Sequence, residues 1–140
     1  TSGNPFTREG ERFEKIRKLL EVTDLVMLDI KHIDDEQHKI LTGQTNRNIL
    51  DMARYLDEIG KPMWIRHVLV PERSDKDEYL TRAFILSLHN VQKVEVLPYH
   101  TLGAYKWKEL GYEYPLEGID PPTQERIKNA NQLLHTGARV

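Results

Sequence analysis

Charged and polar residues recur at the ends of three successive apolar runs in this chain. Asp29 and Lys31 close the run DLVMLDIK, Arg66 lies in MWIRHVLV, and His100 closes KVEVLPYH. Burying an ion is costly unless a partner or a ligand compensates for the lost water. Charges repeated at such positions therefore indicate one shared ligand site.

The alternation of side chains along an extended strand assigns these residues to faces. Residues two apart point the same way, so Asp29 and Lys31 reach the same space. The same rule predicts two more faces, made of Trp64, Arg66, Val68 and Val70 on the second run and of Val94, Val96, Pro98 and His100 on the third. We expect the three faces to line one interior.

Each of these residues also has a simpler interpretation. Asp29 and Lys31 would form an exposed pair at a strand end, Arg66 would balance a core carboxylate, and His100 would be an ordinary loop residue. The other five histidines show no HExxH or comparable ligand spacing, so we assign no metal site to them.

The composition is that of one globular domain, residues 1–140, with 39% hydrophobic residues. The 22 acidic and 20 basic residues nearly cancel, which argues against nucleic-acid or membrane-surface partners. No apolar stretch approaches the roughly 20 residues that span a bilayer, and no secretory signal is recognisable, so we expect a cytoplasmic protein. The absence of cysteine excludes disulfides and any thiolate-bound cluster built from this chain alone.

Helical and strand patterns alternate along the chain. Helices are expected at 8–21 after a Thr7 cap, at 35–42 between Asp34 and Gly43, from Asn46 to Gly60, from Asp75 to about Leu88, and from Thr123 onward. The third helix should bury Ile49, Leu50, Ala53, Leu56 and Ile59, and the fourth Leu80, Ala83, Phe84 and Leu88. Strands are expected at 25–30, 63–70 and 93–97, followed by a long aromatic loop at 98–122.

Strands that alternate with helices predict an α/β fold with right-handed βαβ units and a parallel sheet. Ligands of such folds bind at the carboxyl ends of the strands, where Asp29, Lys31, Arg66 and His100 would lie. The first residues, Thr-Ser-Gly, have the pattern of a turn that follows a further strand, and the chain begins without Met. We therefore expect half of a larger wound sheet or barrel.

At these same positions the sequence resembles a known family. The segments TSGN, EVTDLVMLDIK, GKPMWIRHVLVP and VEVLPYHTLGAYKWKELGYEYPLEGIDPP follow the order and spacing of the C-terminal half of the pyruvate formate-lyase activating enzymes. These are radical S-adenosylmethionine (SAM) enzymes. The resemblance extends over essentially the whole chain, and Pro71-Glu72-Arg73 departs from the Pro-Gly turn common in the family.

The resemblance implies the C-terminal half of a partial (βα)6 TIM-like barrel that binds SAM. It implies SAM contacts from Asp29, Ile30, Lys31, Arg66 and His100. Asp29 and Lys31 would orient the methionine end of SAM, and Arg66 and His100 would donate to the adenosyl end.

Further cofactors and partners are implied in the same way. A monovalent cation would bind the Asp29 carboxylate and the backbone oxygens of Met27 and Thr1. The ligands of the 4Fe-4S cluster would lie outside this chain, so this piece alone should be inactive. The implied oxidoreductase makes a 5′-deoxyadenosyl radical that generates a glycyl radical on pyruvate formate-lyase, with flavodoxin or ferredoxin as electron donor.

Two alternatives remain at this level. The chain could be a non-catalytic half-barrel that serves as a binding or interaction module. It could also belong to an unrelated barrel lyase that uses Lys31 as a Schiff-base amine. The lyase is disfavoured because Asp29, two residues away, should keep Lys31 protonated.

Overall fold

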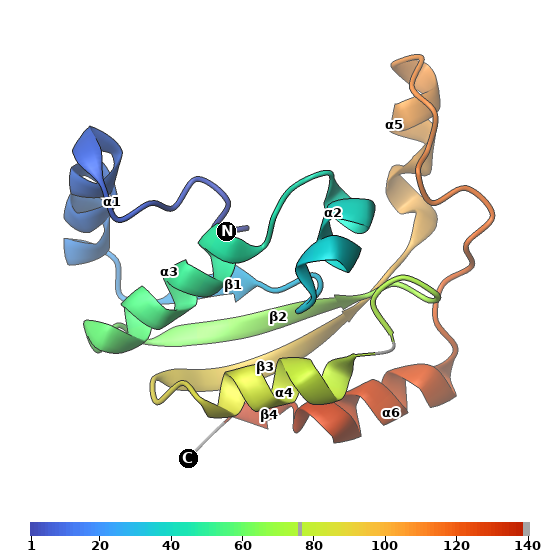
Figure 1. Cartoon of the computed structure of the whole chain (residues 1–140). Coiled ribbons are helices and arrows are strands. Elements are labelled where there is room, and N and C mark those ends of the chain that lie inside the picture. The colour runs from blue at the N-terminus through green and yellow to red at the C-terminus, as the bar shows by residue number, and fades with distance from the viewer. Residues whose placement is uncertain (76, 139–140) are drawn as a thin grey trace.

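The computed structural model describes residues 1–75 and 77–138 and contains alternating helices and strands (Figure 1). The strands are β1 (Val26–Asp29), β2 (Met63–Leu69), β3 (Val91–Pro98) and β4 (Gly137–Ala138). The helices are α1 (Gly10–Glu21), α2 (Asp35–Thr42), α3 (Arg47–Glu58), α4 (Glu78–Leu86), α5 (Ala104–Glu109) and α6 (Gln124–Leu134), with a 3-10 turn, η1, at Thr101–Gly103. None of the helices within these residues is long and apolar enough to cross a bilayer.

The strands of the described residues form one sheet in the order β1-β2-β3-β4. β1 pairs parallel with β2, β2 pairs parallel with β3, and β4 lies antiparallel beside β3. The prediction of an α/β fold with parallel strands alternating with helices is confirmed. The two residues of β4 were not predicted, because so short a strand shows no period-2 pattern.

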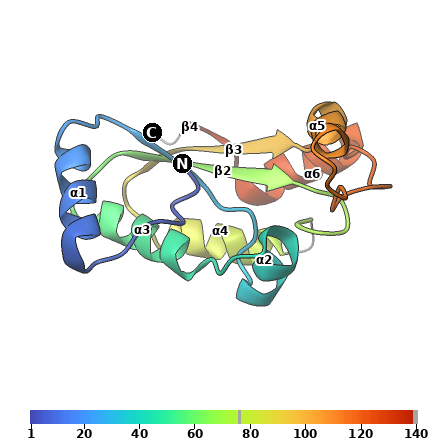
Figure 2. The same ribbon diagram turned by 90° about the horizontal axis from the view of Figure 1, so that it is seen from above.

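One face of the sheet is covered by helices. Seen from above, α3 and α4 run along the same side of the strands (Figure 2). Met63, Ile65, His67 and Leu69 of β2 are buried, whereas the alternate residues Trp64, Arg66 and Val68 are half-buried. This alternation confirms the predicted face for Trp64, Arg66 and Val68, whereas Val70, just beyond the strand, is buried.

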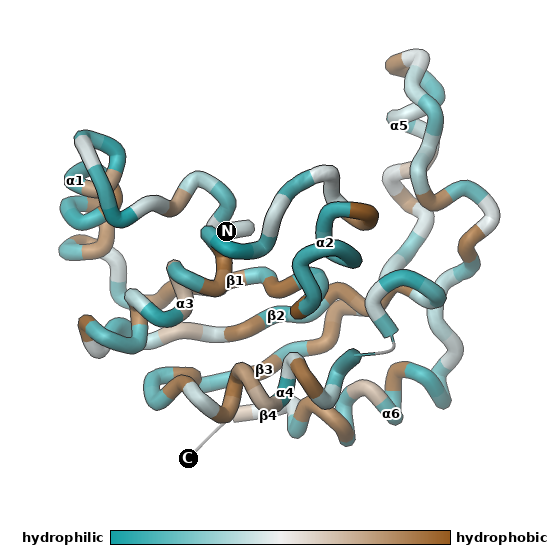
Figure 3. The backbone as a smooth tube through the Cα atoms, in the orientation of Figure 1, coloured by the Kyte–Doolittle hydropathy of each residue, from teal (hydrophilic) through white to brown (hydrophobic). Residues whose placement is uncertain are grey.

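The core lies between the sheet and its helices. Its largest fully buried apolar side chains are Phe6, Leu28, Ile30, Leu56, Met63, Ile65, Leu69, Ile85, Val94 and Leu134. The hydrophobic segments of the backbone follow the strands and the helix surfaces that meet them (Figure 3). Burial of each large apolar side chain contributes about 1.5–3 kcal/mol, so this contact is the main force holding the helices to the sheet.

The residues of β3 that lie beside Arg66 differ from those that the sequence predicted. A register shift follows the Met63–Val91 pair, after which Trp64 pairs with Lys93 and Arg66 with Glu95. Without that shift Arg66 would pair with Val94. Because side chains alternate, one extra residue moves every later side chain to the opposite face. The prediction that Val94, Val96, Pro98 and His100 share the face of Arg66 was therefore wrong, and Val94 is fully buried on the helix side.

Helix ends were predicted well where a side chain bonds the backbone. Asp34 accepts from Gln37 N at the start of α2, Gly43 ends that helix with φ +73°, and Thr123 accepts from Arg126 N at the start of α6. Elsewhere the cap positions were wrong. Glu9 rather than Thr7 precedes α1, and Asp77 rather than Asp75 precedes α4.

Other expectations about burial and loops were wrong. Ile59 is exposed because α3 ends before it, and Leu80 and Ala83 are exposed on the outer side of α4. Met52 and Ile85 are buried in their place. Residues 98–122 contain η1 and α5 rather than a bare loop. Figure 1 shows α5 standing clear of the sheet beyond the carboxyl end of β3.

Gly3 provides a test of the packing between the N-terminal segment and the core. Its φ is +67°, and a Cβ there would lie 2.9 Å from Leu28 Cδ1 and 3.3 Å from Met52 Sδ. Gly3→Ala should lower the free energy of unfolding by about 2–4 kcal/mol, from left-handed backbone strain plus overpacking. Urea denaturation checks this value.

Gly60→Ala is the matched control, because Gly60 has φ +68° and a Cβ there would meet nothing within 4 Å. Gly60→Ala should lower the free energy of unfolding by about 1 kcal/mol, because it adds backbone strain but no overpacking. Equal losses in the two variants would contradict the packing of Gly3 against Leu28.

Candidate functional site

The structure brings Asp29 and Arg66 into direct contact on the less buried face of the sheet. They pair in the register of β1 and β2, and Arg66 Nε donates to Asp29 Oδ1 at 2.7 Å. The two side chains are 17% and 26% exposed. A charge-assisted hydrogen bond in such a half-buried position is stronger than a surface ion pair.

The neighbouring residues on this face are also charged or aromatic. Lys93 Nζ lies 4.5 Å from the centre of the Trp64 ring and forms an ion pair with Glu95. Lys93 and Glu95 are the register partners of Trp64 and Arg66. The less buried face therefore offers charges of both signs beside an aromatic ring, a surface suited to a polar ligand.

Lys31 lies just beyond β1 at the carboxyl edge of the sheet. The ladder extends one residue past the strand, since Ile30 N donates to Arg66 O at 2.8 Å. Ile30 itself is 1% exposed, and Lys31 is half-buried. Among the described residues, the Lys31 ammonium has no hydrogen-bond or ion-pair partner. A half-buried ammonium without a protein partner can bind an anionic group of a ligand.

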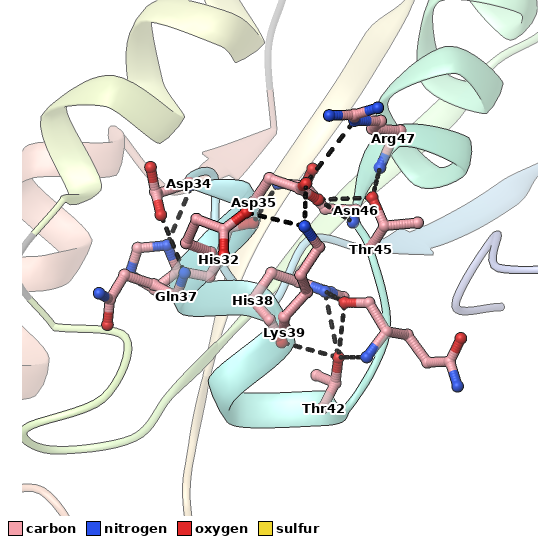
Figure 4. A network of polar contacts seen from close by, with 12 residues as sticks. His32, Asp34, Asp35, Gln37, His38, Lys39, Thr42, Thr45, Asn46 and Arg47 are labelled. Atoms are coloured by element: carbon pink, nitrogen blue, oxygen red, sulfur yellow. Dashed lines mark hydrogen bonds and ion pairs between the residues drawn. The ribbon is translucent and has the colours of Figure 1, made fainter.

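A polar network fixes the backbone that follows Lys31 (Figure 4). Asn46 Nδ2 donates to His32 O at 3.1 Å and to Ile33 O at 2.7 Å, and Asp34 N donates to His32 Nδ1 at 3.0 Å. Asn46 precedes α3 as expected, but its side chain makes no cap bond to that helix. Its amide instead ties the start of α3 to the segment after β1.

Asp35 is the centre of this network. Its carboxylate accepts from Thr45 Oγ1 at 2.5 Å and Asn46 N at 2.9 Å, and it pairs with Lys39 at 3.0 Å. The Thr45 hydrogen bond, followed by that of Lys39, holds the pKa of Asp35 well below its usual range. Burial lowers the pKa of His32, so its ring is neutral and accepts from Asp34 N.

The structure does not bring His100 into the Asp29–Arg66 contact. His100 is exposed, its backbone is extended, and it follows Pro98, which pairs with Leu69 of the buried face. Its predicted role stays a prediction. The adjacent Tyr99, which had no assigned role, is buried, and its hydroxyl lies 2.6 Å from that of Tyr114. Burial raises the pKa of Tyr99 to about 12.

The residues predicted for a monovalent cation lie together but are already bonded to one another. Thr1 N donates to Met27 O at 2.8 Å, and Asp29 N donates to Thr1 O at 3.0 Å. The Asp29 carboxylate is paired with Arg66. Within the described part of the chain, no group of three or more His, Cys, Asp or Glu side chains could hold a metal ion. The cation stays a prediction.

The Asp35 network predicts an acid-dependent loss of stability. Its pKa is lower in the folded state than the value of about 3.9 for an unfolded chain, so its contribution is present above that value and lost as the pH falls toward the folded pKa. Asp35→Asn should therefore destabilise the protein near neutral pH, and its difference from wild type should shrink below about pH 4. Urea unfolding at both pH values measures this.

Glu36→Gln is the control for this comparison, because the Glu36 carboxylate is 76% exposed and pairs only with Lys39 among the described residues. Glu36→Gln should change the free energy of unfolding only slightly at both pH values. An Asp35→Asn difference that stays constant with pH would contradict the network.

Comparison with known proteins relates this geometry to a family. The model of the Radical SAM superfamily matches residues 3–84. The pyruvate formate-lyase-activating enzyme of Streptococcus mutans is 56% identical over 133 residues, which are 94% of this chain and 51% of that protein. That of Listeria monocytogenes is 51% identical over 138 residues, 97% of this chain and 56% of that protein.

The fold has a counterpart among solved structures. A domain of pyruvate-formate lyase-activating enzyme from Bacteroides vulgatus superposes with a TM-score of 0.70 at 22% identity, over 87% of this chain and 68% of that one. This likeness is one of fold. The chain spans about half the length of the curated relatives it matches.

Proposed function

The chain belongs to the radical SAM superfamily, and on that premise we propose that it is the C-terminal part of an activase that generates a glycyl radical on pyruvate formate-lyase. The observation that carries the proposal is the Lys31 ammonium, which has no partner among the described residues, beside the Asp29–Arg66 pair at the carboxyl edge of a parallel sheet. Ligands of parallel α/β sheets bind at that edge.

The charges on this edge complement the methionine end of SAM. Its carboxylate would bind the Lys31 ammonium, and its amino group would bind the Asp29 carboxylate. Within the described part of the chain Arg66 donates to Asp29 through Nε only, which leaves donors on its terminal nitrogens for ribose or carboxylate oxygens. Ile30 would contribute through its backbone position between Asp29 and Lys31. His100, at the end of β3, would turn toward the adenosyl end once SAM is bound.

The remaining parts of the catalyst would come from outside these 140 residues. The chain has no cysteine, so it cannot supply the thiolates of a 4Fe-4S cluster, and the relatives it matches are about twice as long. The cluster would supply the electron, from a donor such as flavodoxin or ferredoxin, that cleaves SAM. This chain's task is to hold SAM in the orientation that the cleavage requires.

The less buried face of the sheet supports a larger barrel. Parallel sheets are normally covered on both faces, yet here Asp29, Trp64 and Arg66 are only half-buried. The backbone of Thr1 already bonds to β1 on the edge opposite to β2, in the manner of a neighbouring parallel strand. In the complete protein, further βα units on that side would close a (βα)6 barrel over this face.

The activity predicts a protein radical. The complete protein, expressed anaerobically with its cluster and reduced in the presence of SAM, should produce a glycyl radical signal in electron paramagnetic resonance on added pyruvate formate-lyase. A pyruvate formate-lyase variant without the acceptor glycine is the control and should give no signal. Absence of the radical with the unaltered partner would refute the activase and favour a non-catalytic half-barrel module.

Lys31 provides the corresponding binding test. Lys31→Ala in the complete protein should weaken SAM binding tenfold or more, since it removes a charge-assisted contact worth about 1.5–3 kcal/mol. Titration calorimetry measures the affinity. Lys15→Ala is the matched control, because Lys15 lies on the exposed surface of α1 and pairs only with Glu11 among the described residues. Equal affinities for all three proteins would remove Lys31 from the site.

A further inference from the structure

We propose that His67 is a positioning residue that holds Lys31 in place for SAM from the opposite, buried face of the sheet. The inference rests on the proposed function, because it concerns the same ligand. His67 belongs to β2 and is 1% exposed, so it cannot touch a ligand on the other face. Its effect must pass through the backbone that it contacts.

The His67 ring lies between two backbone carbonyls from different segments. Nδ1 is 2.9 Å from Ile30 O, just past β1, and Nε2 is 3.2 Å from Ser74 O, in the turn after β2. Neither carbonyl oxygen can donate a proton, so each contact needs an N–H on the ring. The imidazole therefore lies between the end of β1 and the turn that follows β2, and it can donate only from a ring nitrogen that carries a hydrogen.

The neutral ring carries one N–H, which decides which carbonyl it binds. Burial lowers the pKa of His67, so the ring stays uncharged near neutral pH. The shorter contact assigns the N–H to Nδ1, which donates to Ile30 O. A buried carbonyl left without this donor would be costly, so Ile30 O is held strongly in place.

This hydrogen bond fixes the peptide that joins Ile30 to Lys31. Ile30 N donates to Arg66 O on one side of the residue, and Ile30 O accepts from His67 on the other. Two consecutive peptides are then held, and the direction in which the Lys31 side chain leaves the backbone is set. Asn46 holds the carbonyls of His32 and Ile33 in the same way.

The turn on the other side of the His67 ring is also held by hydrogen bonds. Ser74 is 2% exposed, and its hydroxyl accepts from Val70 N at 2.8 Å and donates to Val68 O at 2.7 Å. The turn after β2 is thus bonded to β2 itself. The His67 ring cannot move aside without breaking buried contacts, so it keeps its N–H directed at Ile30.

Two conservative substitutions separate positioning from general stability. The amide nitrogen of Asn reaches the place of Nδ1, whereas that of Gln reaches the place of Nε2. His67→Asn keeps the donor to Ile30, and His67→Gln moves it to Ser74. In the complete protein, His67→Gln should weaken SAM binding about five- to tenfold, while His67→Asn stays within about threefold of wild type. Hydrogen exchange over residues 30–33 should be faster in His67→Gln only.

His38 supplies the matched control. It is also buried, at 2% exposed, and its Nδ1 lies 2.7 Å from Gln44 O, but it belongs to α2 and forms no hydrogen bond with a site residue among those that the structure describes. His38→Gln should lower the urea midpoint and leave SAM affinity unchanged. Equal SAM affinities in the two His67 variants, or losses that follow their urea midpoints, would overturn the positioning role. A wild-type protein that does not bind SAM would overturn the proposed function and this inference with it.

Discussion

The parallel pairing of β1 with β2 is the constraint on which the candidate site depends. That register sets Asp29 against Arg66 and lets Ile30 N donate to Arg66 O just beyond the strand. It also brings His67 within reach of Ile30 O. A slip of one residue would exchange the two faces of β2, burying Arg66 and exposing His67. The register is held by the apolar residues Met63 and Ile65 on the helix side, so the core selects the geometry of the site.

The two faces of the sheet serve different purposes. The helix side is almost entirely apolar and supplies the free energy of folding, with His67 as a buried polar exception whose Nδ1–H donates to Ile30 O. The other side carries charges that are only half-buried, which is uncommon for a parallel sheet. Because each strand places side chains alternately on both faces of the sheet, one backbone carries the residues of the core and those of the site. A residue of the core can therefore orient a residue of the site.

Much of this arrangement could be predicted from local patterns. The period-2 alternation of DLVMLDIK and MWIRHVLV was enough to direct Asp29 and Arg66 to a common face, and Asp34 with Gly43 was enough to define α2. The register shift after Met63 could not be predicted, because a single extra residue in β3 has no compositional signature. The role of His67 was missed for a related reason. Its alternation indicates burial, but its two carbonyl partners come from segments 37 and 7 residues away.

Lys31 determines the net charge at the carboxyl edge of the sheet. Asp29 and Arg66 neutralise each other at 2.7 Å, so the net charge that the described residues offer to a ligand there is the positive charge of Lys31. A carboxylate complements that charge. The proposed ligand, the methionine end of SAM, would also offer an ammonium to the Asp29 carboxylate, so both charged groups of its amino acid moiety would meet an opposite charge on this edge. An isolated anion would meet the Lys31 charge alone.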